Sequence, residues 1–403
     1  MTHALQSLRP WRALSALIAA TALAVGCGGG SESGVGGGGT GSPQSFSRGP
    51  ISGFGSIIVN DVHFDDSGAS VTDDDGNALS GAQSLRLGTV VDVEGGAVSN
   101  GATAASAIRV HVDLVGPVTA AYDATSGRLA VLGQPVRVVS TTALDGFHGG
   151  AAAIAAGSTV AVSSLYDQAT GVYVATRIDP APAATRFAIR GAPSAVDTTA
   201  DTFTIGGVVF SYGSLAPPSP FAAGQLLRAV LAVTPDSQGR WVVTAFGQAQ
   251  SALPEGRSGG VNGVVDSVAD AGHFVVGGVA VDASSAKVTP AGATIGVQAR
   301  VVVQGIVTGG VLVATAVHVR AHHDSDDDSG NGNDAVELDG AILTLDAASQ
   351  TFTMRGPTTV AYAAASFAGG KATDLAVGAM IRVQGNLSAS GAQVIADKIT
   401  FSH

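Results

Sequence analysis

The stretch Asp374–Gly385, "DLAVGAMIRVQG", carries the pattern on which the rest of the chain is built. It holds a leucine, then a glycine, and then apolar residues that alternate with polar ones up to a second glycine. This alternation is typical of a β-strand with one buried face. Ile381 and Val383 are therefore predicted to face a core, and Arg382 and Gln384 to face the solvent.

Related stretches occur four more times, which indicates a tandem repeat. They read "LRLGTVVDVEG", "AIAAGSTVAVSS", "PFAAGQLLRAVL" and "IGVQARVVVQG". A second landmark, a tight bend between two strands, begins at residues 60, 133, 206, 277 and 355. The steps between bends are therefore 73, 73, 71 and 78 residues, and such a near-constant period marks an internal repeat. Most of the bends carry glycine or asparagine, which supply the positive φ that a tight turn needs.

Each repeat is predicted to contain five short antiparallel strands and no helix. Four repeats begin with a hairpin that a glycine opens; these glycines are Gly116, Gly191, Gly263 and Gly340. The first copy has only "ISGFGSIIV" there and is predicted to cap the N-terminal end of the array. A short exit strand with the pattern Ala-x-x-Ile closes the unit, for example at Ala396–Ile399. Five strands in a unit of this size favour a small barrel of the OB type, with a sandwich-like roll as the alternative.

The composition suits small domains that are rich in turns. Hydrophobic residues make up 45% of the 403 residues, but aromatic residues only 5%, and there are 56 glycines. Units this small bury a modest share of their surface, so neighbouring repeats are expected to support one another. The net charge of −11 argues against binding to nucleic acid or to anionic lipid headgroups, because both attract basic proteins.

The N-terminus is predicted to be a lipoprotein signal peptide. Arg9 and Arg12 precede an apolar run, Ala13–Gly26, which is too short to span a bilayer but suits a secretory signal. It ends in "LAVGC", which resembles a bacterial lipobox with Cys27 as the acylated residue. Ala24 stands where leucine is most common, and the alternative is a chance cysteine at the end of an ordinary signal peptide. Cys27 is the one cysteine of the chain, so no intramolecular disulfide can form.

A glycine-rich tether follows the cysteine. The stretch "GGGSESGVGGGGTGSPQS" begins at Gly28 and has the composition of a flexible linker. Such a tether would hold acyl-anchored domains clear of a membrane surface, and two or three acyl chains anchor stably. An aspartate after the cysteine commonly retains such lipoproteins at the inner membrane. Since Gly28 is there instead, the prediction is an outer-membrane lipoprotein of the bacterial cell envelope that faces the periplasm.

The predicted organisation is thus a leader and a tether followed by five β repeats. The boundaries are 1–26 for the lipoprotein signal peptide, 27–48 for the tether, 49–113 for repeat 1, 114–181 for repeat 2, 186–250 for repeat 3, 259–321 for repeat 4, 322–334 for an acidic linker and 335–403 for repeat 5.

These landmarks together resemble a bacterial family called domain of unknown function 5666, which occurs as tandem copies in secreted proteins and lipoproteins. The resemblance rests on "GPISGFGSIIVNDVHFDDSGASV" (Gly49–Val71) and "LRLGTVVDVEGG" (Leu85–Gly96), and it covers most of the chain after Phe46. In later copies other residues replace the glycines of the pattern, namely Ser164, Leu231 and Gln298. The resemblance implies OB-like β domains and an envelope location, and it brings no catalytic residues.

The acidic linker is the one candidate for a metal site. Within "HHDSDDDSGNGND", Asp324, Asp326 and Asp328 alternate as at the start of a calcium-binding EF-hand loop. However, Ser329 and Ala335 stand where that loop requires glycine and glutamate. The alternative is a solvated linker whose charges repel one another. No cofactor is predicted, although calcium could bind here, and His318, His322 and His323 beside the linker are weak candidates for a soft metal ion.

No catalytic constellation is apparent. Serines are common, but no Gly-x-Ser-x-Gly elbow joins a strand to a helix. The histidines His63, His111, His148 and His273 recur at no equivalent position of the repeat. The solvent-facing position that Arg382 occupies in Asp374–Gly385 also varies among the copies. The five residues there are Asp92, Ala161, Arg228, Val302 and Arg382. A shared active site on that face would not tolerate such variation, so the chain is predicted not to be an enzyme.

The favoured function is therefore a non-catalytic, acyl-anchored envelope protein with a structural or binding role. Its partners would be the membrane, through the anchor, and an envelope protein or glycan. One alternative is oligosaccharide binding on the barrel faces, for which Trp241, Tyr166 and Tyr173 are the candidate aromatic platforms. The other is a calcium-responsive envelope protein that uses the acidic linker.

Overall fold

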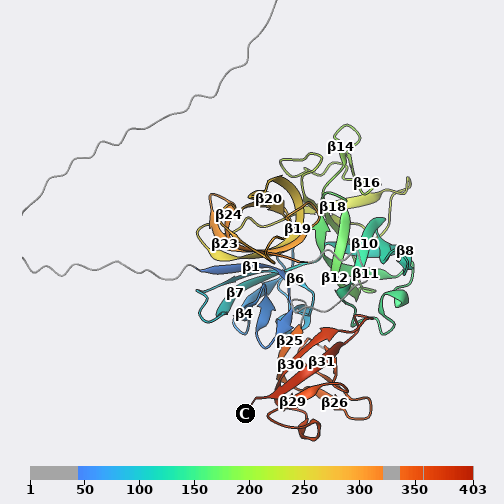
Figure 1. The fold of residues 1–403 in the computed structure, drawn as a ribbon. Coiled ribbons are helices and arrows are strands. Elements are labelled where there is room, and N and C mark those ends of the chain that lie inside the picture. Colours follow the sequence, from blue (N-terminus) through green and yellow to red (C-terminus); the bar gives the residue numbers. More distant parts are fainter. Residues whose placement is uncertain (1–43, 321–335, 357, 403) are drawn as a thin grey trace, which may run out of the picture. The chain divides into compact units, whose positions relative to one another are not determined.

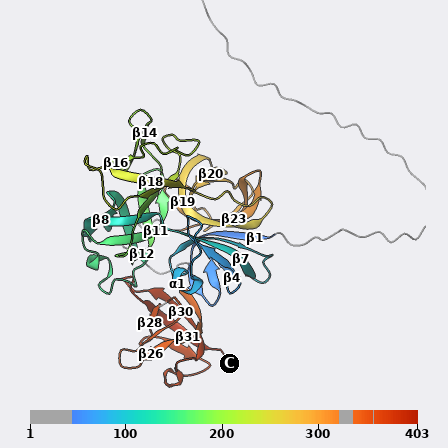
Figure 2. The same ribbon diagram turned by 180° about the vertical axis from the view of Figure 1, so that it is seen from behind.

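The computed structural model describes residues 44–320, 336–356 and 358–402, and these residues form an all-β structure (Figures 1 and 2). Alternating apolar and polar residues recur along the chain, and short strands result wherever they do. The expected fold class is confirmed. No helix in the described part of the chain is long and apolar enough to cross a membrane.

Repeats 1 and 2 contain the first twelve strands. Those of repeat 1 are β1 (Ser45–Pro50), β2 (Gly53–Phe54), β3 (Ile57–Val59), β4 (Val62–Asp65), β5 (Ser70–Thr72), β6 (Val90–Gly95) and β7 (Ala102–His111), with the short helix α1 (Gly81–Ser84) before β6. Those of repeat 2 are β8 (Leu114–Asp123), β9 (Arg128–Val131), β10 (Gln134–Ala143), β11 (Thr159–Asp167) and β12 (Val172–Pro180), with the 3₁₀ helix η1 (Gly150–Ala153) before β11.

Repeats 3, 4 and 5 contain the remaining strands. Repeat 3 has β13 (Phe187–Gly191), β14 (Ala195–Asp197), β15 (Thr202–Ile205), β16 (Val208–Ser211), β17 (Leu227–Leu231) and β18 (Trp241–Gly247). Repeat 4 has β19 (Ser258–Asp270), β20 (His273–Val276), β21 (Val279–Asp282), β22 (Lys287–Thr289), β23 (Arg300–Thr308) and β24 (Val311–Val319). Repeat 5 has β25 (Val336–Ala341), β26 (Thr344–Asp346), β27 (Thr351–Thr353), β28 (Thr359–Ala361), β29 (Ser366–Ala368), the 3₁₀ helix η2 (Ala372–Asp374), β30 (Met380–Leu387) and β31 (Val394–Phe401).

The strands of each repeat close into a barrel, and within the repeat every parallel pairing is made with its last strand. In repeat 2, β8 pairs antiparallel with β9, and β9 with β10. β10 then pairs parallel with β12, β12 antiparallel with β11, and β11 antiparallel with β8. The same ring order occurs in repeat 4. Five strands closed in this order form the barrel of the OB type that the sequence predicts.

The bends lie where the repeat period places them, with one shift of register. Gly206 and Gly207 have φ of 56° and 80°, and Asn60 has φ of 53°, so these bends use positive φ as expected. In repeat 2 the bend was predicted at Gly133 and Gln134, but positive φ occurs at Leu132 and Gly133. Strand β10 therefore begins at Gln134, one residue earlier than predicted, and this residue pairs with Val131 across the hairpin.

A glycine occupies the same register position in the first strand of every repeat. The five pairs across the barrel seam are Gly49 with Val91, Gly116 with Val160, Gly191 with Leu227, Gly263 with Val301, and Gly340 with Ile381. A Cβ atom on Gly116 would lie 2.4 Å from Leu132 Cγ, and one on Gly263 would lie 2.7 Å from Val276 Cγ1. In these two repeats a larger residue would therefore clash with a side chain at or next to the bend.

The hydrophobic cores are shared between repeats, as expected for units this small. One cluster combines repeats 1 and 5, with Phe54 and Phe352 both fully buried, and another combines repeats 2 and 3. Repeat 1 is not a terminal cap, and that prediction is wrong. Its β1 pairs parallel with β19 of repeat 4, and its β2 pairs parallel with β25 of repeat 5. The short entry hairpin of repeat 1 leaves β2 free to accept β25.

The stretch Asp374–Gly385 of repeat 5 alternates as predicted. In the related stretches of the other repeats, however, the residues equivalent to Arg382 do not all face solvent. Ile381 and Val383 are fully buried, whereas Arg382 is exposed. In contrast, the equivalent Arg228 and Val302 are only 6% and 5% exposed. The barrel exterior at this position is therefore an interface between repeats in several copies, which explains why its residue type varies.

Candidate functional site

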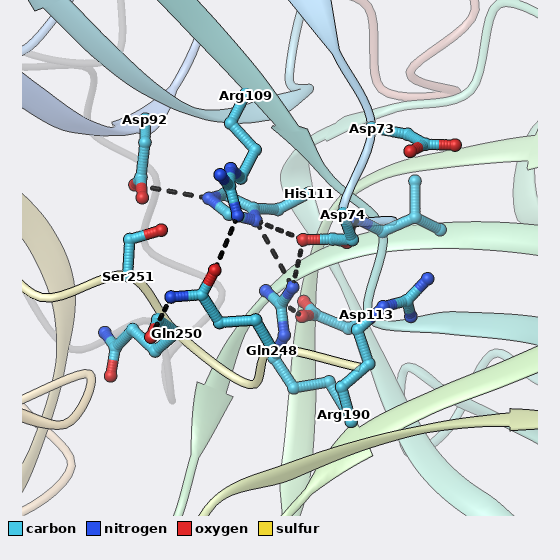
Figure 3. Close-up of polar contacts among 12 residues, drawn as sticks. Asp73, Asp74, Asp92, Arg109, His111, Asp113, Arg190, Gln248, Gln250 and Ser251 are labelled. Carbon is cyan, nitrogen blue, oxygen red and sulfur yellow. Dashed lines mark hydrogen bonds and ion pairs between the residues drawn. The ribbon is translucent and has the colours of Figure 1, made fainter. Parts of the chain in front are cut away.

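A buried charged network joins the barrels of repeats 1, 2 and 3, with His111 at its centre (Figure 3). His111 is the last residue of β7 and is 5% exposed. Its Nδ1 lies 2.7 Å from Oδ1 of Asp74, and its Nε2 lies 3.2 Å from Oδ1 of Asp92. Both ring nitrogens thus face carboxylates, which is the arrangement that favours the doubly protonated imidazolium.

Arg48 and Arg190 complete the network from two different repeats. Arg48 of β1 lies opposite Asp92 in register, and its Nε and Nη2 donate to the two carboxylate oxygens at 2.6 and 2.8 Å. Arg190 of β13 donates to Asp74, and its Nη1 lies 3.3 Å from Oδ1 of Asp113. Each arginine is therefore matched with a carboxylate, as a buried cation requires.

Ser164 holds the second oxygen of Asp113. Its Oγ donates to Asp113 Oδ2 at 2.6 Å, and its backbone N–H donates to the same oxygen at 3.0 Å. Ser164 lies at a bulge that recurs in every repeat, and glycine occupies that place at Gly95 and Gly385. The departure from glycine in repeat 2 thus supplies a buried hydroxyl to the network.

The pKa values of the network follow from burial and pairing. Burial disfavours the imidazolium, but the charge of Asp92 and the bonds to both carboxylates outweigh it and raise the pKa of His111. Burial likewise opposes ionisation of Asp74 and Asp92, yet the nearby cations lower the pKa of both carboxyls. Burial raises the pKa of Asp113. The network therefore favours the charged forms of His111, Asp74 and Asp92.

A second ionic cluster joins repeats 1 and 2. Arg86 donates to Asp145 at 2.7 Å and to Asp179 at 2.8 Å. Arg177, which is 2% exposed, forms ion pairs with the same two aspartates and donates to the carbonyl oxygen of Leu87 at 3.0 Å. Buried ion pairs of this kind contribute little net stability, but a lost partner is costly, so they favour one arrangement of two barrels.

A cavity of about 80 Å³ lies beside the network, where repeats 1, 2, 3 and 4 meet. The network contributes Arg48, His111 and Arg190 to its wall, and β19 contributes Asn262 and Asp266. Arg48, Arg190 and Asn262 are equivalent residues. Each directly precedes the register glycine of its repeat, that is, the glycine at the shared register position of the first strand. The cavity is thus formed where the same exterior position of three barrels converges.

The sequence-predicted sites fall elsewhere. Cys27 and the candidate calcium ligands Asp324, Asp326 and Asp328 lie outside the described residues. Within the described ranges, no group of three His, Cys, Asp or Glu side chains is placed to hold a metal ion.

The predicted aromatic platforms are mostly internal. Tyr173 is fully buried in the core of repeats 2 and 3, and its hydroxyl donates to the carbonyl oxygen of Arg190 at 2.6 Å. The hypothesis that Tyr173 stacks on a glycan is therefore wrong. Trp241 is half-buried and packs edge-on against Phe187, with ring centroids 5.6 Å apart. Tyr166 is half-buried and lies on the cavity wall.

The network was not predicted from the sequence, although one signal for it existed. His111 and Asp113 interrupt the apolar run "IRVHVDLVG" at the junction of repeats 1 and 2. Charged residues within such a run are expected to be buried and paired. Their partners could not be deduced, because Asp74 and Arg190 are 37 and 79 residues away from His111.

Comparison with known families decides what the repeats are. The family model described as "Domain of unknown function (DUF5666)" matches residues 48–109, 115–179 and 339–400. These three segments are DUF5666 domains. The resemblance seen in the sequence is thereby confirmed. Repeats 3 and 4 lie outside the matched ranges but have the same strand order as the DUF5666 domains.

The other comparisons add little. No curated protein matches the chain. A solved structure described as "drosophila Unr CSD456" is similar over 53% of this chain and 96% of that chain, with 10% sequence identity and a TM-score of 0.13. A TM-score this low does not establish a shared fold.

The network belongs to the junction between DUF5666 domains. His111 and Asp113 lie between the matched ranges 48–109 and 115–179, and Arg190 lies beyond both. Asp74 and Arg48 lie within the first DUF5666 domain. A single DUF5666 domain therefore holds only part of the network, and the arrangement depends on several domains folding together.

The geometry does not suit nucleophilic catalysis. A serine nucleophile needs a base that accepts its proton, and a histidine usually supplies it. Here Ser164 donates to Asp113, while both nitrogens of His111 face Asp74 and Asp92. An imidazolium held in this way has no free lone pair with which to act as a general base.

Proposed function

We propose that the protein is a non-catalytic, acyl-anchored component of the bacterial cell envelope, in which the OB-like domains act together as a structural or binding body. The observation that carries this proposal is the buried charged network across repeats 1, 2 and 3. Modules that acted independently would have no need of buried charges whose partners lie in a neighbouring module.

The anchoring part rests on the sequence. The apolar run that ends in "LAVGC", the single Cys27 and the glycine-rich stretch after it fit an acylated protein at the outer membrane that faces the periplasm. Incorporation of labelled palmitate tests this part. We expect label in the wild-type chain and none in Cys27→Ser. Equal labelling of both, or none in the wild type, would refute the anchor.

The joint action of the domains is tested by calorimetry. If the shared cores and ion pairs couple the barrels, all five repeats unfold in one cooperative transition, and the calorimetric and van't Hoff enthalpies of that transition agree. Independent modules would instead give separate transitions whose enthalpies add up to the total. That second result would reject the proposed joint body without touching the anchor.

The described residues also support the non-catalytic part, since the one buried histidine is paired with two carboxylates. A screen of the purified chain against generic ester, phosphoester and glycoside substrates provides the test. We expect turnover no faster in the wild type than in Ser164→Ala or His111→Asn.

A further inference from the structure

Asp266 on the cavity wall is a carboxylate without a cation. Its Oδ2 accepts a hydrogen bond from the backbone N–H of Gly278 at 2.7 Å. Its Oδ1 is buried and makes no hydrogen bond of ordinary geometry among the described residues, although the backbone N–H of Gln168 also acts on the carboxyl. No arginine, lysine or histidine of the described ranges forms an ion pair with it, and the charged group that acts on its pKa is another carboxylate, Asp167. The group thus lacks the partner that a buried charge requires.

The cations on the same wall already form ion pairs. Arg48 is matched with Asp92, and Arg190 with Asp74 and Asp113. Arg48 Nη1 and Arg190 Nε nevertheless make no hydrogen bond among the described residues. His111 lies between two carboxylates of the same set. Asp266 is thus a carboxylate of the cavity wall that has no ion pair among the described residues.

A second acceptor and an aromatic ring lie on the wall with Asp266. Asn262, four residues earlier on β19, is 7% exposed, and its Oδ1 has no partner among the described residues. Tyr166 of β11 presents its half-buried ring to the same cavity. Carboxylate and amide oxygens accept hydrogen bonds from an ammonium group, and an aromatic ring attracts a cation that lies over its face.

The rest of the wall includes an apolar patch. Val90, Leu165 and Val264, from three repeats, pack against one another beside the cavity. At roughly 12 Å³ for each water-sized position, the cavity has room for about six to seven such positions. That is the size of a ligand with a few carbon atoms.

We propose that this cavity binds a small organic ammonium ion, whose charged nitrogen lies at Asp266 and whose hydrocarbon part lies on Val90, Leu165 and Val264. The site is independent of the acyl anchor and of whether the barrels unfold together. It exists only in the assembled array, because its walls come from repeats 1, 2, 3 and 4.

Three probes of similar size test the charge preference. Titration of the full-length chain with n-butylammonium, n-butanol and butyrate, followed calorimetrically at pH 7.5, compares a cation, a neutral molecule and an anion with short unbranched alkyl chains. We expect n-butylammonium to bind at least tenfold more tightly than either of the others. Equal affinities would mean an apolar pocket without the proposed charge recognition, and preference for butyrate would mean that Arg48 or Arg190 selects the ligand. Both results would overturn the proposal.

The pH dependence provides a second readout. Burial raises the pKa of Asp266 to about 6, and the titratable groups that face it are Asp167 and Tyr166. Since the ionised carboxylate binds the cation, the affinity for n-butylammonium is expected to fall by about tenfold for each pH unit below about 6. An affinity that does not change between pH 7.5 and pH 4.5 would contradict the role of Asp266.

A variant that removes the charge of Asp266 tests whether the ligand binds there. Asp266→Asn keeps an oxygen that can accept from Gly278 and is expected to bind n-butylammonium at least tenfold more weakly, while circular dichroism is unchanged. Asp270→Asn is the matched control, because Asp270 lies on the same strand but is exposed. Wild-type affinity in Asp266→Asn, or an equal loss in both variants, would refute the assignment. Should Asp266→Asn fail to fold, the three probes on the wild-type chain still decide.

Discussion

Arg48 and Arg190 occupy the same position in two repeats, each directly before the register glycine, and both lie on the wall of one cavity. Two barrels thus carry an arginine at equivalent positions that lie close together, but the two arginines have different partners. Arg48 pairs with a carboxylate of its own barrel, whereas Arg190 pairs with Asp74 of repeat 1 and with Asp113, which directly precedes β8. The exterior of the barrel at this position is what joins the domains.

The first prediction concerns Asn60, the bend residue of repeat 1. Its Nδ2 lies within hydrogen-bond distance of Ser47 Oγ at 2.9 Å, of the carbonyl oxygen of Arg48 at 3.0 Å and of that of Gly260, in repeat 4, at 3.2 Å. Asn60→Gly keeps the positive φ of the bend and removes all three contacts. We expect it to lower the free energy of unfolding by about 2 kcal/mol in a urea titration.

Asn100→Gly is the control for this change. Asn100 also has positive φ, at 51°, but is exposed and makes no side-chain hydrogen bond among the described residues. Its replacement is expected to be neutral or slightly stabilising. If both variants shift the midpoint alike, the contacts of Asn60 across the junction are not what stabilises the bend.

The second prediction is a pH window for stability. The raised pKa of His111 contributes stability that is complete below about pH 6.5 and is lost as the pH rises through the folded value. The lowered pKa values of Asp74 and Asp92 contribute stability above about pH 3.9, which is lost as the pH falls through their folded values. The network is therefore most stabilising between about pH 4 and 6.5.

His111→Asn tests this window. We expect the variant to lose about 3 kcal/mol at pH 6, where a buried ion pair is broken, and clearly less at pH 9. Urea midpoints of both chains from pH 4 to 9 give the measurement. His273→Asn serves as the control, because that histidine is exposed. A loss in His111→Asn that is the same at every pH would show that the imidazole acts through packing alone.

The third prediction exchanges residues at the recurring bulge. Ser164→Gly restores the glycine that repeats 1, 4 and 5 have at this place but removes the hydroxyl that donates to Asp113, and it is expected to cost about 2 kcal/mol. The reverse change in repeat 4, Gly305→Ser, places a Cβ 2.1 Å from the carbonyl oxygen of Val313 and is expected to cost more. Thermal unfolding of both variants gives the comparison. A stabilised Ser164→Gly would mean that Ser164 contributes nothing to the network.

The fourth prediction concerns Gln298, which replaces a glycine that the other repeats keep. Its φ is 72°, close to the 78° to 87° of Gly88, Gly157, Gly224 and Gly378. Gln298→Gly relieves this backbone conformation but removes the bond from Nε2 to Asp167 Oδ2 at 3.2 Å. We expect a net gain of about 0.5 kcal/mol in the free energy of unfolding.

Gly378→Ala measures the backbone cost by itself. A Cβ there would meet nothing within 4 Å, so a loss of about 1 kcal/mol would come from φ alone. If Gln298→Gly destabilises while Gly378→Ala behaves as expected, the contact with Asp167 outweighs the strain, and Gln298 is a junction residue.

The elements of each barrel were predictable because they are local. The alternation in "MIRVQG", the glycines at the bends and the near-constant period depend on neighbours in the chain, and strand order then follows from the closure of a small barrel. The one-residue shift at Leu132 shows the limit of such inference. Positive φ at Leu132 has no marker in the sequence, because leucine rarely adopts it.

The candidate site was not predictable in the same way. Asp92 and Arg228 sit at the polar position of an alternating strand, where the sequence alone indicates solvent. Only the packing of other barrels against that face turns these residues into buried partners of Arg48 and Asp75.

The sequence by itself determined the all-β class, the five repeats and the domain type, because periodicity and turn-forming residues are local features of the chain. The tertiary structure alone decided which repeats touch. Repeat 1, which the sequence predicts as a terminal cap, instead lies where β1 pairs with β19 and β2 pairs with β25. Asp266 lies beside a cavity and has no ion-pair partner among the described residues. The physical reason is that contacts between barrels join residues far apart in the chain, and no local pattern encodes such a pairing. Asp66 and Arg355, for example, form an ion pair across 289 positions.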